Sequence, residues 1–282
     1  MKRREFLQMT SAAALFPRTA HAGSTPFRFG LTPVFLSNDL EVTERLRSYF
    51  AARLGTDVEL VTRRTYQEIT ALVVSGQIDA AWICGYPYVQ YREELELLAA
   101  PVWRGRSLYQ SYLIVPAGRP VDDWTDLRGD VHAFSDPDSN SGYLVTQALL
   151  AESGLREQDF FPRTIFTYGH RNVIRAVAAG LCTSGSVDGY VWEVMRATEP
   201  ALVDQTQVLR KSEWLAFPPL ATSRGLQDDK RVRDFRDVLL AMADDPEAAS
   251  ILSQLQLDGF AHCDPAEFDA IATKFATYRR FG

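Results

Sequence analysis

Apolar positions alternate in some segments of the chain and recur every three to four residues in others. Expected β-strands occupy residues 27–31, 58–61, 78–84, 97–102, 111–115, 132–134, 163–167 and 186–191. Expected helices occupy residues 40–54, 67–74, 144–153, 170–180, 231–242, 246–255 and 265–278. Strands that alternate with helices are typical of α/β proteins with a largely parallel sheet. The sequence therefore predicts an α/β fold.

Two stretches of the chain resemble each other and indicate two lobes. Residues 66–79 and 170–188 each begin with Tyr or His, continue as a helix that ends at Gly76 or Gly180, and lead into a strand that carries an Asp. Small-ligand sites form where parallel strands end, and two such lobes facing each other enclose a cleft. We expect a first lobe at 23–115 and 220–282 and a second lobe at 116–219. Ser111–Val115 and Glu213–Leu220 are the expected crossover segments.

The first 22 residues have the features of an export signal. Arg3 and Arg4 stand before an apolar run, and Ala20-His21-Ala22 matches an A-x-A cleavage site. We interpret residues 1–22 as a twin-arginine signal peptide cleaved after about Ala22, which predicts a periplasmic protein. No later run approaches the ~20 apolar residues of a membrane span, so stable membrane insertion is not expected.

The net charge of the protein limits the classes of molecule that it is expected to bind. The formal net charge is −6, and removal of residues 1–22 takes away four basic residues and one acidic residue, which gives −9. Such an acidic exported protein is a poor partner for nucleic acid or anionic membranes. A small anion remains possible as a ligand, because main-chain N–H groups and hydroxyls bind anions without a net positive charge.

The stretch Ser139-Asn140-Ser141-Gly142 is the strongest candidate for such a site. Asp136-Pro-Asp138 ends the preceding strand by turn chemistry, and an apolar helical stripe follows from Leu144. The first turn of a helix has unpaired N–H groups and the positive end of the helix dipole. We expect it to hold a small oxyanion. An ordinary N-cap is the alternative for this segment taken alone, since Ser and Asn are favoured there.

These motifs together resemble the periplasmic phosphate/phosphonate/phosphite-binding proteins of ABC importers, over essentially the whole mature chain. The resemblance is carried by Thr65-Tyr66, the Asp79–Gly85–Tyr88 region, Asp136 to Tyr143, Gly169-His170 with Ala176 to Gly180, Val187-Asp188 and Phe217-Pro-Pro219. It implies a two-lobed, type II periplasmic-binding-protein fold that closes on its ligand and delivers it to an ABC permease. The ligand-binding residues that we expect are Tyr66, Cys84, Tyr86, Tyr88, Ser139, Asn140, Ser141, His170 and Asp188.

Two departures from the family pattern affect the ligand. Phe217-Pro218-Pro219 lacks the acid that aminoalkylphosphonate-binding members carry in the second crossover. In the stretch Cys84 to Tyr88, the spacing between Gly and Tyr is one residue shorter than in the family pattern that we expect. Its cysteine leaves an alternative open, since arsenite-sensing periplasmic proteins are similar overall and depend on a cleft cysteine. In that case Cys84 would bind arsenite and the partner would be a membrane sensor kinase; a buried core role for Cys84 is also open.

Catalytic and metal-binding interpretations are less favoured. Ser141, His170 and Asp188 could form a nucleophile, base and acid, but no G-x-S-x-G elbow is present. The three cysteines, Cys84, Cys182 and Cys263, have no metal-ligand spacing, and the adjacent His262 and Asp264 are poorly placed to converge on a metal. We therefore expect a binding protein without catalytic residues, metal or cofactor.

Overall fold

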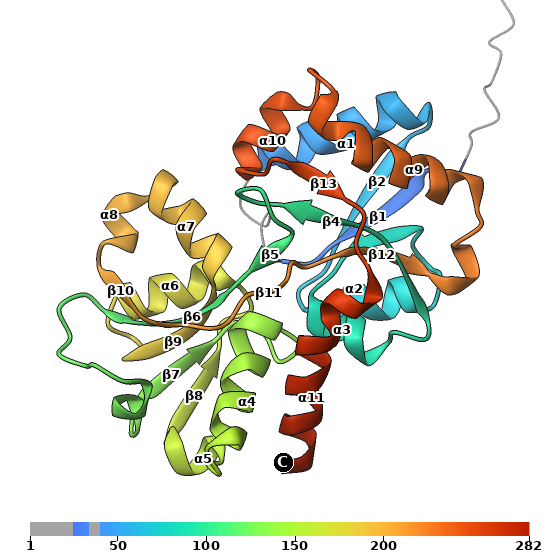
Figure 1. The fold of residues 1–282 in the computed structure, drawn as a ribbon. Helices are drawn as coiled ribbons and strands as arrows, with labels where there is room; N and C mark the ends of the chain where they lie inside the picture. Colours follow the sequence, from blue (N-terminus) through green and yellow to red (C-terminus); the bar gives the residue numbers. More distant parts are fainter. Residues whose placement is uncertain (1–24, 34–39, 282) are drawn as a thin grey trace, which may run out of the picture.

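Two separate β-sheets organise the chain in the computed structural model, which describes residues 25–33 and 40–281 (Figure 1). The first sheet has the strand order β13-β4-β12-β3-β1-β2, and the second has the order β10-β6-β9-β7-β8. In the first sheet β1 pairs parallel to β2 and β3, and in the second β7 pairs parallel to β8 and β9. The two-lobed α/β architecture predicted from the sequence is confirmed.

Each sheet carries its own helices. The first lobe contains β1 (Phe27–Leu31), α1 (Leu40–Leu54), β2 (Val58–Thr62), α2 (Tyr66–Val74), β3 (Ala80–Trp82), α3 (Gly85–Gln90), β4 (Leu95–Val102), β12 (Leu220–Ser223), η3 (Arg224–Leu226), α9 (Lys230–Ala241), η4 (Met242–Asp244), α10 (Ala249–Leu255), β13 (Gly259–Ala261) and η5 (Pro265–Phe268). The second lobe contains β6 (Ser111–Pro116), η1 (Trp124–Leu127), β7 (Val131–Phe134), η2 (Asn140–Leu144), α4 (Val145–Glu152), α5 (Glu157–Phe160), β8 (Arg163–Phe166), α6 (His170–Ala178), β9 (Ser184–Asp188), α7 (Gly189–Thr198), α8 (Pro200–Val203) and β10 (Thr206–Lys211).

The local pattern explains the strands of the first core. Phe27, Phe29 and Leu31 of β1 are buried, and Arg28 between them is only partly covered. The rings of Phe27 and Phe29 both pack against Phe235 of α9, with ring centroids 4.8 and 5.0 Å apart. The alternation thus directs aromatic side chains toward the covering helix.

One strand lies elsewhere than expected. The sequence interpretation gave Ser111–Val115 to the first lobe as a crossover, but β6 pairs antiparallel with β9 and β10 inside the second sheet. The chain instead crosses between the lobes at a small ribbon of β5 (Leu108–Tyr109) and β11 (Leu215–Ala216). The five apolar or small residues 111–115 are all buried, which suits a central strand better than an exposed linker.

The C-terminal helix α11 (Asp269–Phe281) contacts both lobes. It packs against α3 of the first lobe and against α4 and η2 of the second, and Figure 1 shows it extending alongside α4. The sequence interpretation placed this segment in the first lobe alone.

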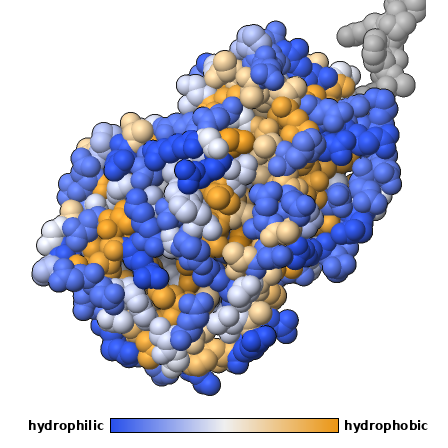
Figure 2. Space-filling view, in the orientation of Figure 1, coloured by the Kyte–Doolittle hydropathy of each residue, from blue (hydrophilic) through white to orange (hydrophobic). Residues whose placement is uncertain are grey.

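On the face shown in Figure 2, hydrophilic residues cover most of the periphery of both lobes and apolar groups form smaller patches. Within the described residues, no helix is both long and apolar enough to cross a lipid bilayer. Cys84, Cys182 and Cys263 are all free thiols.

Candidate ligand-binding site between the lobes

The loop after β7 has the geometry expected of a helix start. The Ser139 hydroxyl accepts a hydrogen bond from the main-chain N–H of Gly142 at 2.9 Å, and η2 begins at Asn140 as a π-helical turn that continues into α4. Ser139, Asn140 and Ser141 are at most 1% exposed. A Cβ at Gly142 would lie 1.9 Å from Ser135 Oγ and 2.9 Å from His170 Cε1, so only glycine fits there.

Tyr66 faces this loop from the first lobe. Thr65 and Glu68 form a capping box that fixes the start of α2, which makes Tyr66 the first residue of the helix. Its main-chain N–H donates to Asp136 Oδ2 of the second lobe at 3.3 Å. Burial raises the pKa of Asp136 to about 6, although the N–H groups of Asp138 and Tyr66 oppose the shift. A helix start in one lobe is thus capped by a carboxyl group of the other.

Cys84 forms a second contact between the lobes. Its sulfur accepts a hydrogen bond from the main-chain N–H of Asn140 at 3.1 Å. The residue is 2% exposed and lies just after β3, as the N-cap of α3. Burial raises the pKa of the Cys84 thiol to about 12, so the group is protonated at neutral pH.

Two residues that the sequence interpretation missed reach the loop, one from the crossover strand β5 and one from the start of β6. The Tyr109 hydroxyl accepts a hydrogen bond from Asn140 Nδ2 at 2.8 Å, and Ser111 Oγ donates to the Ser141 carbonyl oxygen at 2.5 Å. Tyr109 is fully buried, and burial raises its pKa. Tyr109 and Ser111 stand on either side of the point where the chain passes from the first lobe to the second. This position was the only feature of the local sequence that could have marked them as site residues.

His170 and Asp188 complete the second lobe's side of the site. His170 is the first residue of α6, and its Nδ1 accepts the main-chain N–H of Asp188 at 3.0 Å. Burial lowers the pKa of His170 to about 3, so the ring is neutral and its proton is on Nε2. The Asp188 carboxylate caps α7 by accepting from the N–H groups of Tyr190 and Val191. Burial nevertheless raises the pKa of Asp188 to about 7.

Among the residues that the structure describes, four buried side-chain atoms around the loop have no hydrogen-bond partner. They are Tyr66 Oη, Ser135 Oγ, Asn140 Oδ1 and Ser141 Oγ. Buried polar groups in folded proteins are almost always hydrogen-bonded, so a cluster of exceptions requires an explanation. No lysine or arginine is among the buried residues in the part of the chain that the structure describes.

Tyr86 and Tyr88 lie toward the C-terminal segment. The Tyr86 ring packs against Phe275 of α11 with a centroid separation of 5.2 Å, and the Tyr88 ring packs against Phe268 at 4.6 Å. Of the nine predicted site residues, the structure therefore brings seven together around the loop. Tyr109, which was not among the nine, places its hydroxyl beside Asn140 of the loop.

Residues 29–268 match the family model described as ABC transporter, phosphonate, periplasmic substrate-binding protein. The phosphate-import protein PhnD of Mycolicibacterium smegmatis is 27% identical over 208 residues, which cover 69% of this chain. The match spans 65% of that relative's length, just under two thirds.

Solved structures agree in fold. A binding protein component of an ABC phosphonate transporter from Pseudomonas aeruginosa superposes with a TM-score of 0.83 at 22% identity, covering 92% of this chain and 88% of that one. PhnD1 from Prochlorococcus marinus, solved with methylphosphonate, gives a TM-score of 0.79 at 15% identity, covering 90% and 98%. These likenesses confirm the type II periplasmic-binding-protein fold.

Proposed function

Because the chain belongs to the family of periplasmic substrate-binding proteins of phosphonate ABC transporters, we propose that it captures a small phosphorus oxyanion between its lobes. The ligand class comprises phosphonate, phosphite and phosphate. The loaded, closed form is then presented to an ABC permease. A named phosphate importer and a methylphosphonate complex among the similar proteins support this ligand class.

The cluster of buried polar atoms without partners carries the proposal. The hydroxyls of Tyr66, Ser135 and Ser141 can each donate one hydrogen bond, and the neutral His170 ring can donate from Nε2. An oxyanion with three or four oxygens accepts several such bonds at once. The donors are neutral, so selectivity rests on matching hydrogen bonds, since an unmatched buried donor costs about 1–3 kcal/mol.

The contacts between the lobes support a hinge mechanism. Asp136 bonds to the N-terminus of α2, and the Asn140 N–H bonds to Cys84, so the loop contacts the first lobe directly. Tyr109 on the crossover bonds to the same Asn140. A ligand that bonds to both sides favours the closed state by its difference in affinity for the closed and open forms.

The arrangement of His170 suits binding better than hydrolysis. In a serine hydrolase the histidine Nδ1–H donates to a carboxylate, whereas here Nδ1 accepts a main-chain N–H from Asp188. The Asp188 carboxylate bonds to the first turn of α7 instead. We therefore include in the proposal that Ser141 donates a hydrogen bond and does not attack a substrate.

The arsenite-sensor alternative has no observation in its favour. The Cys84 thiol is protonated and already accepts a hydrogen bond from the loop. None of the relatives named above is described as an arsenite-binding protein or as a partner of a sensor kinase. The twin-arginine signal at 1–22 lies outside the described residues and stays a prediction. Membership of a family of periplasmic substrate-binding proteins supports a location in the periplasm.

A ligand screen tests the proposed function. The mature chain is heated in the presence of phosphate, phosphite, methylphosphonate, sulfate or arsenite, and unfolding is followed by fluorescence. A ligand at about 100 times its Kd stabilises the folded state by about 2.7 kcal/mol. We expect a shift with at least one phosphorus oxyanion, abolished by Ser141→Ala and retained in Ser153→Ala, an exposed control. No shift with any of the three phosphorus oxyanions contradicts the ligand class.

A further inference from the structure

The first half of α11 is fixed to the first lobe. The Asp269 carboxylate bonds to the Arg92 guanidinium at 3.0 Å. Ile271 is fully buried and lies against Gly85, where a Cβ would come within 2.7 Å of its Cδ1. These contacts tie the start of the helix to α3 and to the turn that follows it, so the helix moves with the first lobe.

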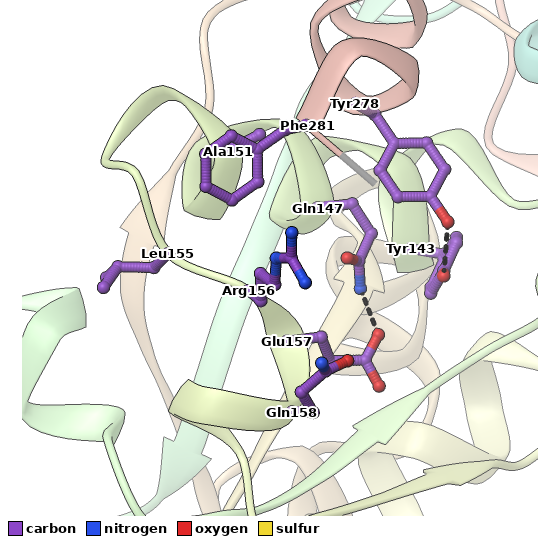
Figure 3. A pocket seen from close by; sticks show the side chains of 9 residues that line it. All are labelled: Tyr143, Gln147, Ala151, Leu155, Arg156, Glu157, Gln158, Tyr278 and Phe281. Carbon is purple, nitrogen blue, oxygen red and sulfur yellow. Dashed lines mark hydrogen bonds between the residues drawn. The ribbon is translucent and has the colours of Figure 1, made fainter.

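The second half of α11 contacts the crossover and the second lobe. Lys274 Nζ lies 2.5 Å from Glu213 Oε1, in the segment between β10 and β11. One turn further on, the Tyr278 hydroxyl lies 3.1 Å from the Tyr143 hydroxyl, and Figure 3 shows the two hydroxyls pointing toward each other. Tyr143 directly follows Gly142 of the ligand loop, so this bond joins α11 to the loop itself.

The contact of α11 with α4 leaves a pocket at its C-terminal end. The pocket has a volume of about 270 Å³ and lies between the last turns of the two helices (Figure 3). Its lining consists of Tyr143, Gln147, Ala151, Leu155, Arg156, Glu157, Gln158, Tyr278 and Phe281. Of the residues of α11, all of which the structure describes, Ile271 alone is buried. Separation of the last turns from α4 would therefore leave the buried Ile271 in place, whereas the first turn cannot leave the first lobe without exposing it.

We propose that α11 is a strap between the lobes and that Tyr278 is a positioning residue, which holds the ligand loop in its closed arrangement through Tyr143. The inference rests on the hinge closure proposed above. Opening of the cleft carries Tyr143 away with the second lobe while α11 stays on the first, so their bond exists only in the closed form. The bond adds to the stability of the closed state and slows ligand release, although neither hydroxyl belongs to the ligand site.

A double-mutant cycle tests the strap. Tyr278→Phe and Tyr143→Phe each remove one hydroxyl and keep the ring, and Arg280→Ala is an exposed control on the same helix turn. We expect each Phe variant to raise the Kd for methylphosphonate about three- to tenfold by faster dissociation, and the double variant to lose no more than either single variant. Arg280→Ala leaves Kd unchanged. Additive losses in the double variant, or unchanged dissociation, overturn the proposal.

Hydrogen exchange separates a failure of the strap from a failure of the proposed ligand. The ligand-free protein also populates the closed form, so its amides at residues 275–281 should exchange up to about three- to tenfold faster in either Phe variant than in the wild type. Amides of residues 269–272 should not change. Unchanged exchange at 275–281 overturns the strap even if methylphosphonate binds. Faster exchange without binding of any phosphorus oxyanion leaves the strap standing and rejects the ligand class.

Discussion

The main-chain N–H of Asp188 donates a hydrogen bond to Nδ1 of His170, 3.0 Å away, and this one bond decides what the histidine can do. It commits Nδ1 as an acceptor, so the proton of the neutral ring is on Nε2. A strand end and a helix start of the second lobe thereby set a hydrogen-bond donor beside the ligand loop. The donor needs no positive charge, which fits a site with two buried carboxyl groups.

The substitution His170→Asn separates the roles of the two ring nitrogens of the histidine. The Asn Oδ1 can still accept the Asp188 N–H, but the Nε2–H donor is lost. We expect the thermal stability of the ligand-free protein to stay near that of the wild type, whereas the Kd for methylphosphonate rises roughly 10- to 100-fold, as for loss of a hydrogen bond to a charged group worth about 1.5–3 kcal/mol. Calorimetry measures the Kd. An unchanged Kd would remove His170 from the site.

The substitution Asp188→Asn tests how the buried carboxyl group of Asp188 changes stability with pH. The pKa of Asp188 is about 7 in the folded protein against 3.8 for the ordinary group. A raised pKa gives stability that is complete below the unfolded pKa and is lost as pH rises through the folded one. Wild type should therefore lose stability relative to Asp188→Asn between about pH 4 and pH 7, by an amount on the order of a few kcal/mol at most.

Denaturant titrations across this pH range measure the difference between the two proteins. His170 changes protonation below its ordinary pKa of 6.5 and acts in the opposite direction, but it is common to both, so the difference reports Asp188. Asparagine can also accept the N–H groups at the start of α7, so capping is preserved. A pH-independent difference would show that the carboxyl group is not perturbed.

Ser141→Ala should affect the ligand-bound and ligand-free states in opposite ways. The hydroxyl is buried and has no hydrogen-bond partner among the described residues, so its removal should leave the free energy of unfolding unchanged or raise it by up to about 1 kcal/mol. Ligand affinity should fall at least tenfold. Denaturant unfolding and calorimetry on the same sample measure both. A clear loss of ligand-free stability would indicate a structural role for the hydroxyl.

Gly142→Ala tests the close packing of the loop. The new methyl group would lie 2.8 Å from Ser135 Cβ as well as against the hydroxyl, and rotation of the serine side chain cannot relieve both contacts. We expect destabilisation by about 1–3 kcal/mol, as for overpacking, together with loss of ligand binding. Gly225→Ala is the matched control, since only Ser223 Oγ at 3.7 Å would touch its methyl group. Equal stability of the two variants would contradict the geometry.

Two substitutions of Cys84 distinguish a structural acceptor from a reactive thiol. Serine can accept the Asn140 N–H as the sulfur does, whereas alanine leaves that N–H without a partner. We expect Cys84→Ser to keep the Kd for methylphosphonate within about threefold, and Cys84→Ala to cost about 1–3 kcal/mol of stability. Binding of arsenite that disappears in Cys84→Ser would revive the sensor alternative.

Local pattern was sufficient for most elements and for the ligand loop. The alternation of strands and helices, the glycines that end α2 and α6, and the Ser-Asn-Ser-Gly stretch before α4 all depend on neighbours in sequence. Tyr66 and His170, which begin the two similar stretches, are indeed the first residues of their helices. These features follow from backbone propensity and capping, which act over a few residues.

Tertiary structure alone decided which groups meet across the lobes. An apolar run such as 111–115 indicates a buried strand, but its partners in the second sheet lie more than 70 residues further along the chain. The side chains of Tyr86 and Tyr88 follow the turn of α3, a helix that the sequence interpretation did not predict. This turns Tyr86 toward Phe275 of α11 and Tyr88 toward Phe268 of η5. Tyr109 reaches Asn140, and Tyr278 reaches Tyr143, only because the crossover and the C-terminal helix pass beside the loop. Such contacts depend on long-range packing and cannot be predicted from local periodicity.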